Sequence, residues 1–130
     1  MFPSIQTTKT RVSTINGKNV VQFFNSQTDL WEQDIALTFT TSGMAIFTLD
    51  TDVAAEPYVF FGALQQVAQG STPDTNWDFL INGEGNSITF TNNCSNTQDI
   101  DIRLTLIKRD AEDLDNAIIS ADPRIKNVPD

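Results

Sequence analysis

Histidine is absent from this chain of 130 residues, and cysteine occurs only once. Without histidine the chain has no Ser-His-Asp or Cys-His catalysis, no His-ligated metal centre and no general base of the kind that usually works near neutral pH. A single cysteine, Cys94, excludes an internal disulfide framework. With no histidine to activate it, the Cys94 thiol is expected to be packed or a spectator. The sequence therefore predicts a protein that is not an enzyme.

Long apolar runs and basic residues are also scarce. No stretch reaches the roughly 18 apolar residues that indicate a membrane-spanning helix, so no membrane is expected as a partner. The N-terminal residues lack the basic and apolar regions of a signal peptide. A cytoplasmic location is therefore expected, and assembly into a virion or an extracellular structure stays open. The net charge is −9, and nucleic acid is not an expected partner because phosphate binding needs a basic surface.

The charge is unevenly distributed along the chain. The first 20 residues carry Lys9, Arg11 and Lys18 and no acid, whereas the other 110 carry five basic and all 17 acidic residues. Residues 1–19 are also rich in Thr, which favours extended chain. We therefore expect a basic N-terminal arm of residues 1–19, before a body of residues 20–130, that associates with another subunit through Lys9, Arg11 and Lys18. The alternative is a loose terminus or an edge strand.

Apolar residues alternate with polar ones along residues 77–110, which is typical of half-buried antiparallel strands. The turn formers of residues 82–86 separate the first two strands, so we expect a three-stranded meander here. Residues 35–41 alternate in the same way, and the Ser42-Gly43 turn signal precedes a return strand over residues 44–49. This segment predicts a second hairpin.

Eight to ten short strands with turn signals between them and little helix are expected in total. This pattern indicates an all-β fold, a single-domain antiparallel β-sandwich of the jelly-roll or Ig-like type. Nine Phe residues are available for its core, and Trp31 is expected to cap one end of that core because Trp is usually highly buried.

Acidic residues are the one plentiful group that could bind a ligand or act in catalysis. Calcium takes six to eight oxygen ligands, often from loop carboxylates, although solvated acids that keep the protein soluble are the main expectation and no cofactor is needed. The candidate calcium ligands are Asp50, Asp52, Asp110, Glu112 and Asp113. Paired carboxylates of a glycosidase would come from Asp50, Asp52, Glu56, Asp99 and Asp101.

Two loops rich in amides could bind carbohydrate, because an amide offers both a donor and an acceptor. Trp77 or Tyr58 would supply the ring for stacking. Asn and Gly are also the usual turn residues, so a purely structural use of these loops is the alternative. The candidate ligand residues are Asn82, Glu84, Asn86, Asn92 and Asn93.

The C-terminal residues 118–128 read IISADPRIKNV, with Asp122, Pro123, Ile125 and Asn127 in an Asp-Pro-x-Ile-x-Asn pattern. This ending resembles small bacterial all-β proteins, including a family named after cytoplasmic inclusion bodies. The resemblance covers about 30 residues of the chain. It implies a β-sandwich and transfers no catalytic residues.

The sequence thus favours a structural or self-assembling β-sandwich, such as a virion, filament or inclusion-type subunit. The expected partner is another copy of the chain, giving a homo-oligomer held by the N-terminal arm and by sheet edges. The competing hypothesis is a carbohydrate-binding module assisted by calcium, and a glycosidase ranks third.

Overall fold

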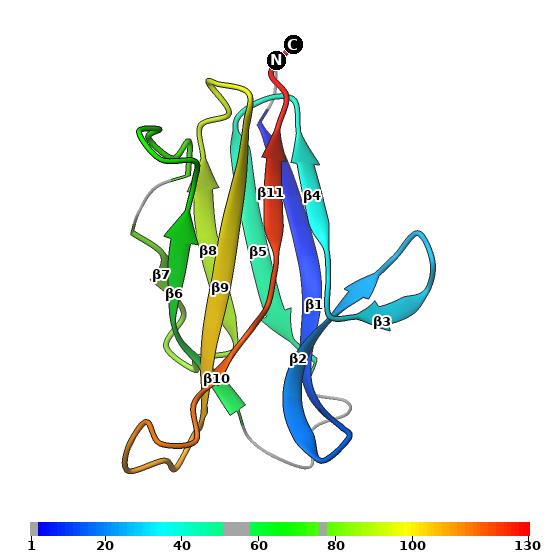
Figure 1. Cartoon of the computed structure of the whole chain (residues 1–130), viewed down its shortest axis with the longest axis vertical. Coiled ribbons are helices and arrows are strands. Elements are labelled where there is room, and N and C mark those ends of the chain that lie inside the picture. The colour runs from blue at the N-terminus through cyan, green and yellow to red at the C-terminus, as the bar shows by residue number, and fades with distance from the viewer. Residues whose placement is uncertain (1–2, 51–57, 76–77) are drawn as a thin grey trace.

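The chain forms two β-sheets that pack face to face as a sandwich (Figure 1). The structure, a computed structural model, describes residues 3–50, 58–75 and 78–130. The strands within these residues are β1 (Ser4–Ile15), β2 (Lys18–Asn25), β3 (Leu30–Glu32), β4 (Ala36–Phe39), β5 (Gly43–Leu49), β6 (Tyr58–Gln66), β7 (Leu80–Ile81), β8 (Ser87–Asn92), β9 (Gln98–Lys108), β10 (Ile118–Ile119) and β11 (Arg124–Asn127). The predicted β-sandwich is confirmed, with eleven strands in the described residues where eight to ten were expected.

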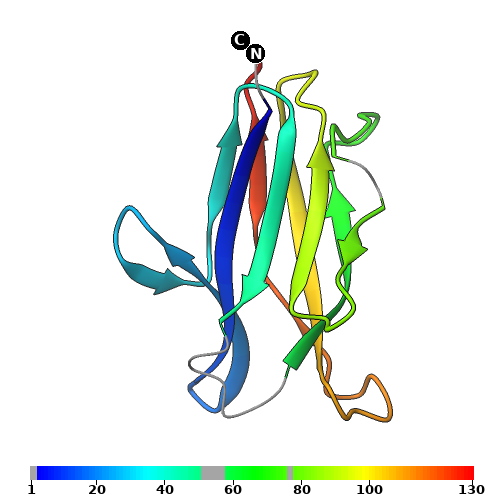
Figure 2. The same cartoon turned by 180° about the vertical axis from the view of Figure 1, so that it is seen from behind.

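The larger sheet has the strand order β3-β2-β1-β5-β8-β7, and the smaller one has β10-β9-β11-β4 with β6 paired to β9. Most pairs are antiparallel, but β1 pairs with β5 and β4 pairs with β11 in parallel. Figure 2 shows the larger sheet from its outer side, with β1, β5 and β8 next to one another. Within the described residues the chain has no helix long and apolar enough to cross a membrane.

The core lies between the two sheets and is rich in phenylalanine. Phe23, Phe47 and Phe90 are fully buried on the inner face of the larger sheet, and the Phe47 ring makes edge contacts to the other two at centroid distances of 5.9 and 6.2 Å. Alternate residues of β9, from Ile100 to Leu106, cover them from the other side and are also fully buried. The period of two in the sequence therefore corresponds to one buried face on each sheet.

The predicted meander over residues 77–110 is wrong in its last step. β7 and β8 form the expected hairpin, but β8 pairs with β5, and β9 belongs to the other sheet. Strands that face each other across a sandwich bury one side just as neighbouring strands do, so alternation does not distinguish the two arrangements. Trp77, where the predicted meander begins, lies outside the described residues.

The predicted hairpin over residues 35–49 is wrong for the same reason. β4 and β5 lie in different sheets, and the Ser42-Gly43 turn carries the chain across the core as an arch. Gly43 is buried against the backbone of Ser4, which is its partner in the β1–β5 pairing. The glycine therefore permits a close backbone approach and does not close a hairpin.

The N-terminal arm also needs correction. Residues 4–15 form β1, which lies between β2 and β5 inside the larger sheet of its own chain. The Thr8 and Thr10 side chains of β1 are buried, because β1 pairs with β5 along Ser4–Thr10 and with β2 along Thr10–Ile15, and these two side chains face the core. Residue 19 therefore lies inside β2 and marks no boundary between an arm and a body.

Candidate functional site

The outer face of the larger sheet carries basic and uncharged side chains. No residue of β1, β2, β5 or β8 is Asp or Glu, and their charged residues are Lys9, Arg11 and Lys18. The strand registers place the following side chains on this outer face, which we call the basic face: Ile5, Thr7, Lys9, Arg11, Ser13, Ile15, Lys18, Val20, Gln22, Phe24, Trp31, Met44, Ile46, Thr48, Leu80, Ser87, Thr89 and Thr91.

Pairing within the sheet brings the three predicted assembly residues to this one face. Lys9 and Arg11 alternate with the buried Thr8 and Thr10 and so point outward, while Lys18 pairs with Ile15 of β1. Lys9 and Lys18 are exposed. The residues expected to lie on an extended basic arm instead form a basic stripe on the larger sheet of their own chain.

Arg11 is held in place by its neighbours on the basic face. Its Nε donates a hydrogen bond of 2.9 Å to Gln22 Oε1, and its guanidinium lies 4.3 Å from the centroid of the Trp31 ring. Trp31 in turn makes an edge contact with Phe24. The expectation that Trp31 caps the core is therefore wrong, because β3 pairs it with the outward-facing Phe24.

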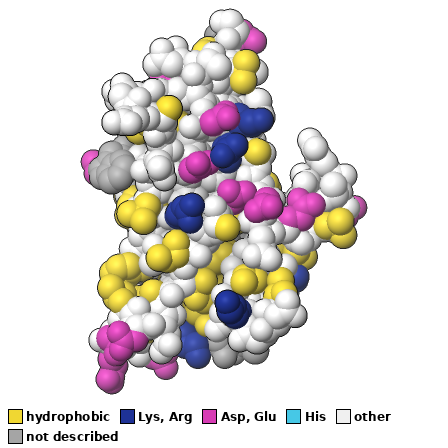
Figure 3. Space-filling model, viewed as in Figure 1, with side chains coloured by type: hydrophobic (Ala, Val, Ile, Leu, Met, Phe, Trp, Pro, Cys, Tyr) yellow, Lys and Arg dark blue, Asp and Glu magenta, His cyan; other side chains and the backbone are white. Residues whose placement is uncertain are grey.

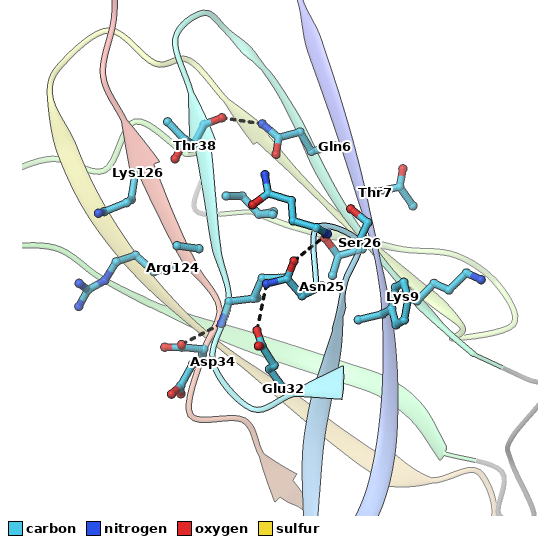
Figure 4. A pocket seen from close by; sticks show the side chains of 17 residues that line it. Gln6, Thr7, Lys9, Asn25, Ser26, Glu32, Asp34, Thr38, Arg124 and Lys126 are labelled. Carbon is cyan, nitrogen blue, oxygen red and sulfur yellow. Dashed lines mark hydrogen bonds between the residues drawn. The ribbon is translucent and has the colours of Figure 1, made fainter. Parts of the chain in front are cut away.

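A groove with a volume of about 1060 Å³ opens beside the basic face, between β1 and β4 (Figure 4). β1 has 12 residues, but β2 pairs only with its second half, from Thr10 to Ile15. After Phe24 the chain turns away into the β2–β3 hairpin, which projects from the sandwich (Figure 1). The groove occupies the position beside Gln6–Lys9 that a longer β2 would fill.

One end of the groove has two acidic residues together with Lys9, and the other end has a basic residue. Glu32 and Asp34 lie near the β2–β3 hairpin, and Lys126 lies beside Thr38 at the far end of β4 (Figure 4). Arg124, between them, donates from Nε to Asp101 Oδ1 at 2.8 Å, so its charge is already matched.

Asp122 is a carboxylate held partly out of water at the acidic end of the groove. Its Oδ2 accepts a hydrogen bond of 3.2 Å from the Ile35 N–H. Burial raises the pKa of Asp122, and the negative charge of Asp34 adds to the rise, against the lowering by the Ile35 hydrogen bond and by Arg124. The carboxylate is therefore less favourable in the folded chain than in water.

We expect the Asp122→Asn variant to gain stability relative to wild type as the pH rises. A raised pKa means that the folded state holds the proton of Asp122 more tightly than the unfolded state does. The contribution of Asp122 to the free energy of unfolding therefore falls as the pH rises from about 3.9 through the folded pKa. Asparagine keeps an oxygen that accepts from Ile35 and has no charge. Urea unfolding of both proteins between about pH 3 and pH 7 measures the difference, and a difference that stays flat would contradict the expectation.

A family model described as the DP-EP family matches residues 6–129. This chain belongs to the DP-EP family. No curated protein gives a significant match to it. The matched residues include the groove and all of the basic face except Ile5.

Two of the predicted ligand residues of this DP-EP chain are parts of the framework. Asn92 is fully buried, and its amide exchanges hydrogen bonds of 2.8 and 2.9 Å with the amide of Asn127. The N–H of exposed Asn93 donates to the carbonyl of Asp74, and the Asp74 carboxylate accepts from Ser95 Oγ at 2.6 Å and the Asn96 N–H at 2.7 Å. The Asn92 amide is therefore not available to a ligand.

The other predicted amide loop lies at the opposite end of β8. Asn82 accepts from the N–H groups of Asn86 and Ser87, and the Asn82 and Asn86 side chains bond to each other. Glu84 accepts from Asn86 Nδ2 at 3.3 Å. Because a six-residue strand spans roughly 17 Å, the structure does not bring the two amide loops together.

The predicted calcium ligands do not converge either. Within the described ranges no three Asp, Glu or Cys side chains are grouped so that they could hold a metal ion, so Asp110, Glu112 and Asp113 form no such cluster. Asp113 Oδ1 instead accepts from the Asp115 N–H. Asp50 lies directly after β5, and Asp52 and Glu56 are outside the described residues.

Cys94 and the C-terminal motif are explained by packing. The Cys94 thiol donates to the Phe39 carbonyl oxygen at 3.3 Å, and burial, together with the charge of Asp74, raises the pKa of the thiol.

In the C-terminal Asp-Pro-x-Ile-x-Asn motif, Ile125 is fully buried in the core, and the Asn127 amide pairs with the Asn92 amide. These residues of the DP-EP chain connect β11 to its neighbours.

Proposed function

We propose that this chain is a non-enzymatic subunit that associates with further copies of itself through the basic face. The observation that carries the proposal is the complete absence of acids from β1, β2, β5 and β8 in a chain with 17 of them. Acidic proteins repel one another in solution. The basic face has no acids and carries three basic side chains and several apolar ones. An acidic surface of a second copy is therefore attracted to this face and not repelled by it.

The partner surface on the second copy is the acidic loop between β9 and β10. This loop has four exposed acidic residues close together in the sequence: Asp110, Glu112, Asp113 and Asp115. A contact between two different surfaces is heterologous, so repetition of it gives rings or filaments. Figure 3 shows the outer face of the smaller sheet, where acidic and basic side chains are mixed and no equivalent single-sign surface is seen.

We expect the double variant Lys9→Glu/Lys18→Glu to weaken association at least tenfold. Both side chains are exposed, so the change reverses two charges on the basic face without removing a contact of the fold. Charged residues at the rim of an interface act mainly through the long-range attraction between the two partners. Light scattering of a dilution series at low and high salt measures the effect, and high salt should weaken the wild-type assembly.

The matched control is Arg103→Glu/Lys126→Glu. It makes the same change in net charge on two exposed side chains of the smaller sheet. We expect it to assemble as wild type does. A wild-type protein that stays at the monomer mass of 14.4 kDa at every concentration would overturn the proposal, and so would equal losses in both double variants.

A further inference from the structure

The first half of β1 has an open edge toward the groove. β1 pairs with β5 through its even-numbered residues: Ser4 N–H donates to Ser42, and Asp50 N–H donates to the Thr10 carbonyl. In such a parallel pair the alternate residues turn their backbone groups away. Ile5, Thr7 and Lys9 therefore direct N–H and C=O groups toward the position that β2 leaves empty. In the described part of the chain no strand pairs with this edge.

The opposite wall is also a strand edge. β4 is the last strand of its sheet, and the Arg124 N–H donates to Ile35 and the Val128 N–H to Phe39, so Ala36 and Thr38 turn their backbone groups toward the groove. A side-chain hydrogen bond crosses the gap at one end, from Gln6 Nε2 to the Thr38 carbonyl at 2.7 Å. The floor includes Leu37, which is almost completely buried.

We propose that this groove binds an extended peptide segment of a partner protein, which adds to β1 as an antiparallel strand. The peptide takes the place in line with β2, so it runs in the direction of β2 and completes the sheet by strand addition. Gln6–Lys9 contribute about 13 Å of groove wall at the usual rise per residue. About four residues of the peptide pair there.

The charges of the groove specify the direction and chemistry of the peptide. A strand antiparallel to β1 begins opposite Lys9, near the two acids Glu32 and Asp34 that outnumber it, and ends near Lys126 (Figure 4). The preferred segment therefore has a basic residue at its start and an acidic residue at its end, with alternating small apolar residues that face Leu37. The groove shares Thr7, Lys9 and Phe24 with the basic face, but the peptide binds the backbone edge of β1, and peptide binding does not depend on self-association.

The test uses three synthetic hexapeptides with blocked ends. The first reads Lys-Val-Thr-Val-Thr-Glu, the second exchanges its first and last residues, and the third has the first sequence with N-methyl groups on alternate amides. We expect the first to bind at least tenfold more tightly than the second in fluorescence titration, because reversal places like charges together at both ends. The third should lose binding, because a methylated amide cannot donate to β1.

Two measurements on the protein complete the test. Thr7→Pro removes an N–H that the fold does not use, and proline is tolerated where the N–H of an edge strand faces outward, so this variant should keep its melting temperature within a few degrees and lose the peptide. In the wild-type chain, the amides of Ile5, Thr7 and Lys9 should become protected from hydrogen exchange when the peptide binds.

Three outcomes would overturn the proposal: equal affinity for the forward and reversed peptides, undiminished binding of the methylated one, or unchanged exchange of the three β1 amides at saturating peptide. If the chain fails to self-associate and yet binds the forward peptide, the peptide site stands and the proposed self-association falls. Wild-type assembly without peptide binding gives the opposite result.

Discussion

Replacing Gly43 by alanine should destabilise the fold by about 3 kcal/mol, the upper range for forcing atoms into a packed interior. A Cβ at this position would overlap the backbone carbonyl oxygen of Ser4 and would lie 2.8 Å from its carbon. Backbone atoms cannot move aside as the end of a flexible side chain can, so the start of β1 has to separate from β5. The parallel pairing would then be lost at the point where Ser4 donates to Ser42.

Thermal unfolding followed by circular dichroism measures this effect, and a fall in melting temperature of roughly 10 °C is expected. Gly83→Ala is the matched control, because a Cβ there would meet no atom within 4 Å. That variant should stay within about 1 kcal/mol of wild type. If the two glycine variants melt together, Gly43 is not required for the close approach of β1 to β5.

Replacing Asn127 by leucine should cost about 3 kcal/mol, because it leaves the fully buried Asn92 amide without its partner. The two amides exchange two hydrogen bonds, and Asn92 Oδ1 also accepts from the Cys94 N–H at 3.3 Å. Asparagine and leucine are similar in size, so the substitution leaves little cavity. The loss of stability therefore comes mainly from the Asn92 amide that has lost its partner.

The double variant Asn92→Leu/Asn127→Leu should lose less stability than the two single variants added together, by about 1 kcal/mol or more. Each single change leaves one buried amide without the other amide, and the double change removes both amides. Urea denaturation of the four proteins measures the coupling, with Asn116→Leu in an exposed loop as the control. Strict additivity would show that the two amides do not act as a pair.

The sequence predicted the class of fold and most of the strands, because alternation reports directly on which side of a strand is buried. The partners of each strand could not be predicted in this way. β8 and β9 alternate identically whether they are neighbours or face each other across the core, and the parallel pairing of β4 with β11 joins residues such as Ala36 and Arg124 from distant parts of the chain. The pattern of residues within one strand does not predict which distant strand it pairs with.

The candidate surfaces were predictable to different degrees. Lys9, Arg11 and Lys18 were identified from charge alone, but only pairing with β2 and β5 shows that they share a face with no acid. Asp74 was missed: it lies in a loop that reads as solvated, and its burial depends on Ser95 and Asn96 from another loop. The groove was missed as well, because it results from the length by which β1 exceeds its pairing with β2.

The position of β11 has a consequence for synthesis of the chain on the ribosome. This strand lies between β4 and β9, yet it follows both of them in the chain, at residues 124–127. Until those residues leave the exit tunnel, both neighbours present unpaired edges, which are open to pairing with other chains. The smaller sheet is therefore completed only once residues 124–127 have emerged, after all the strands that β11 joins.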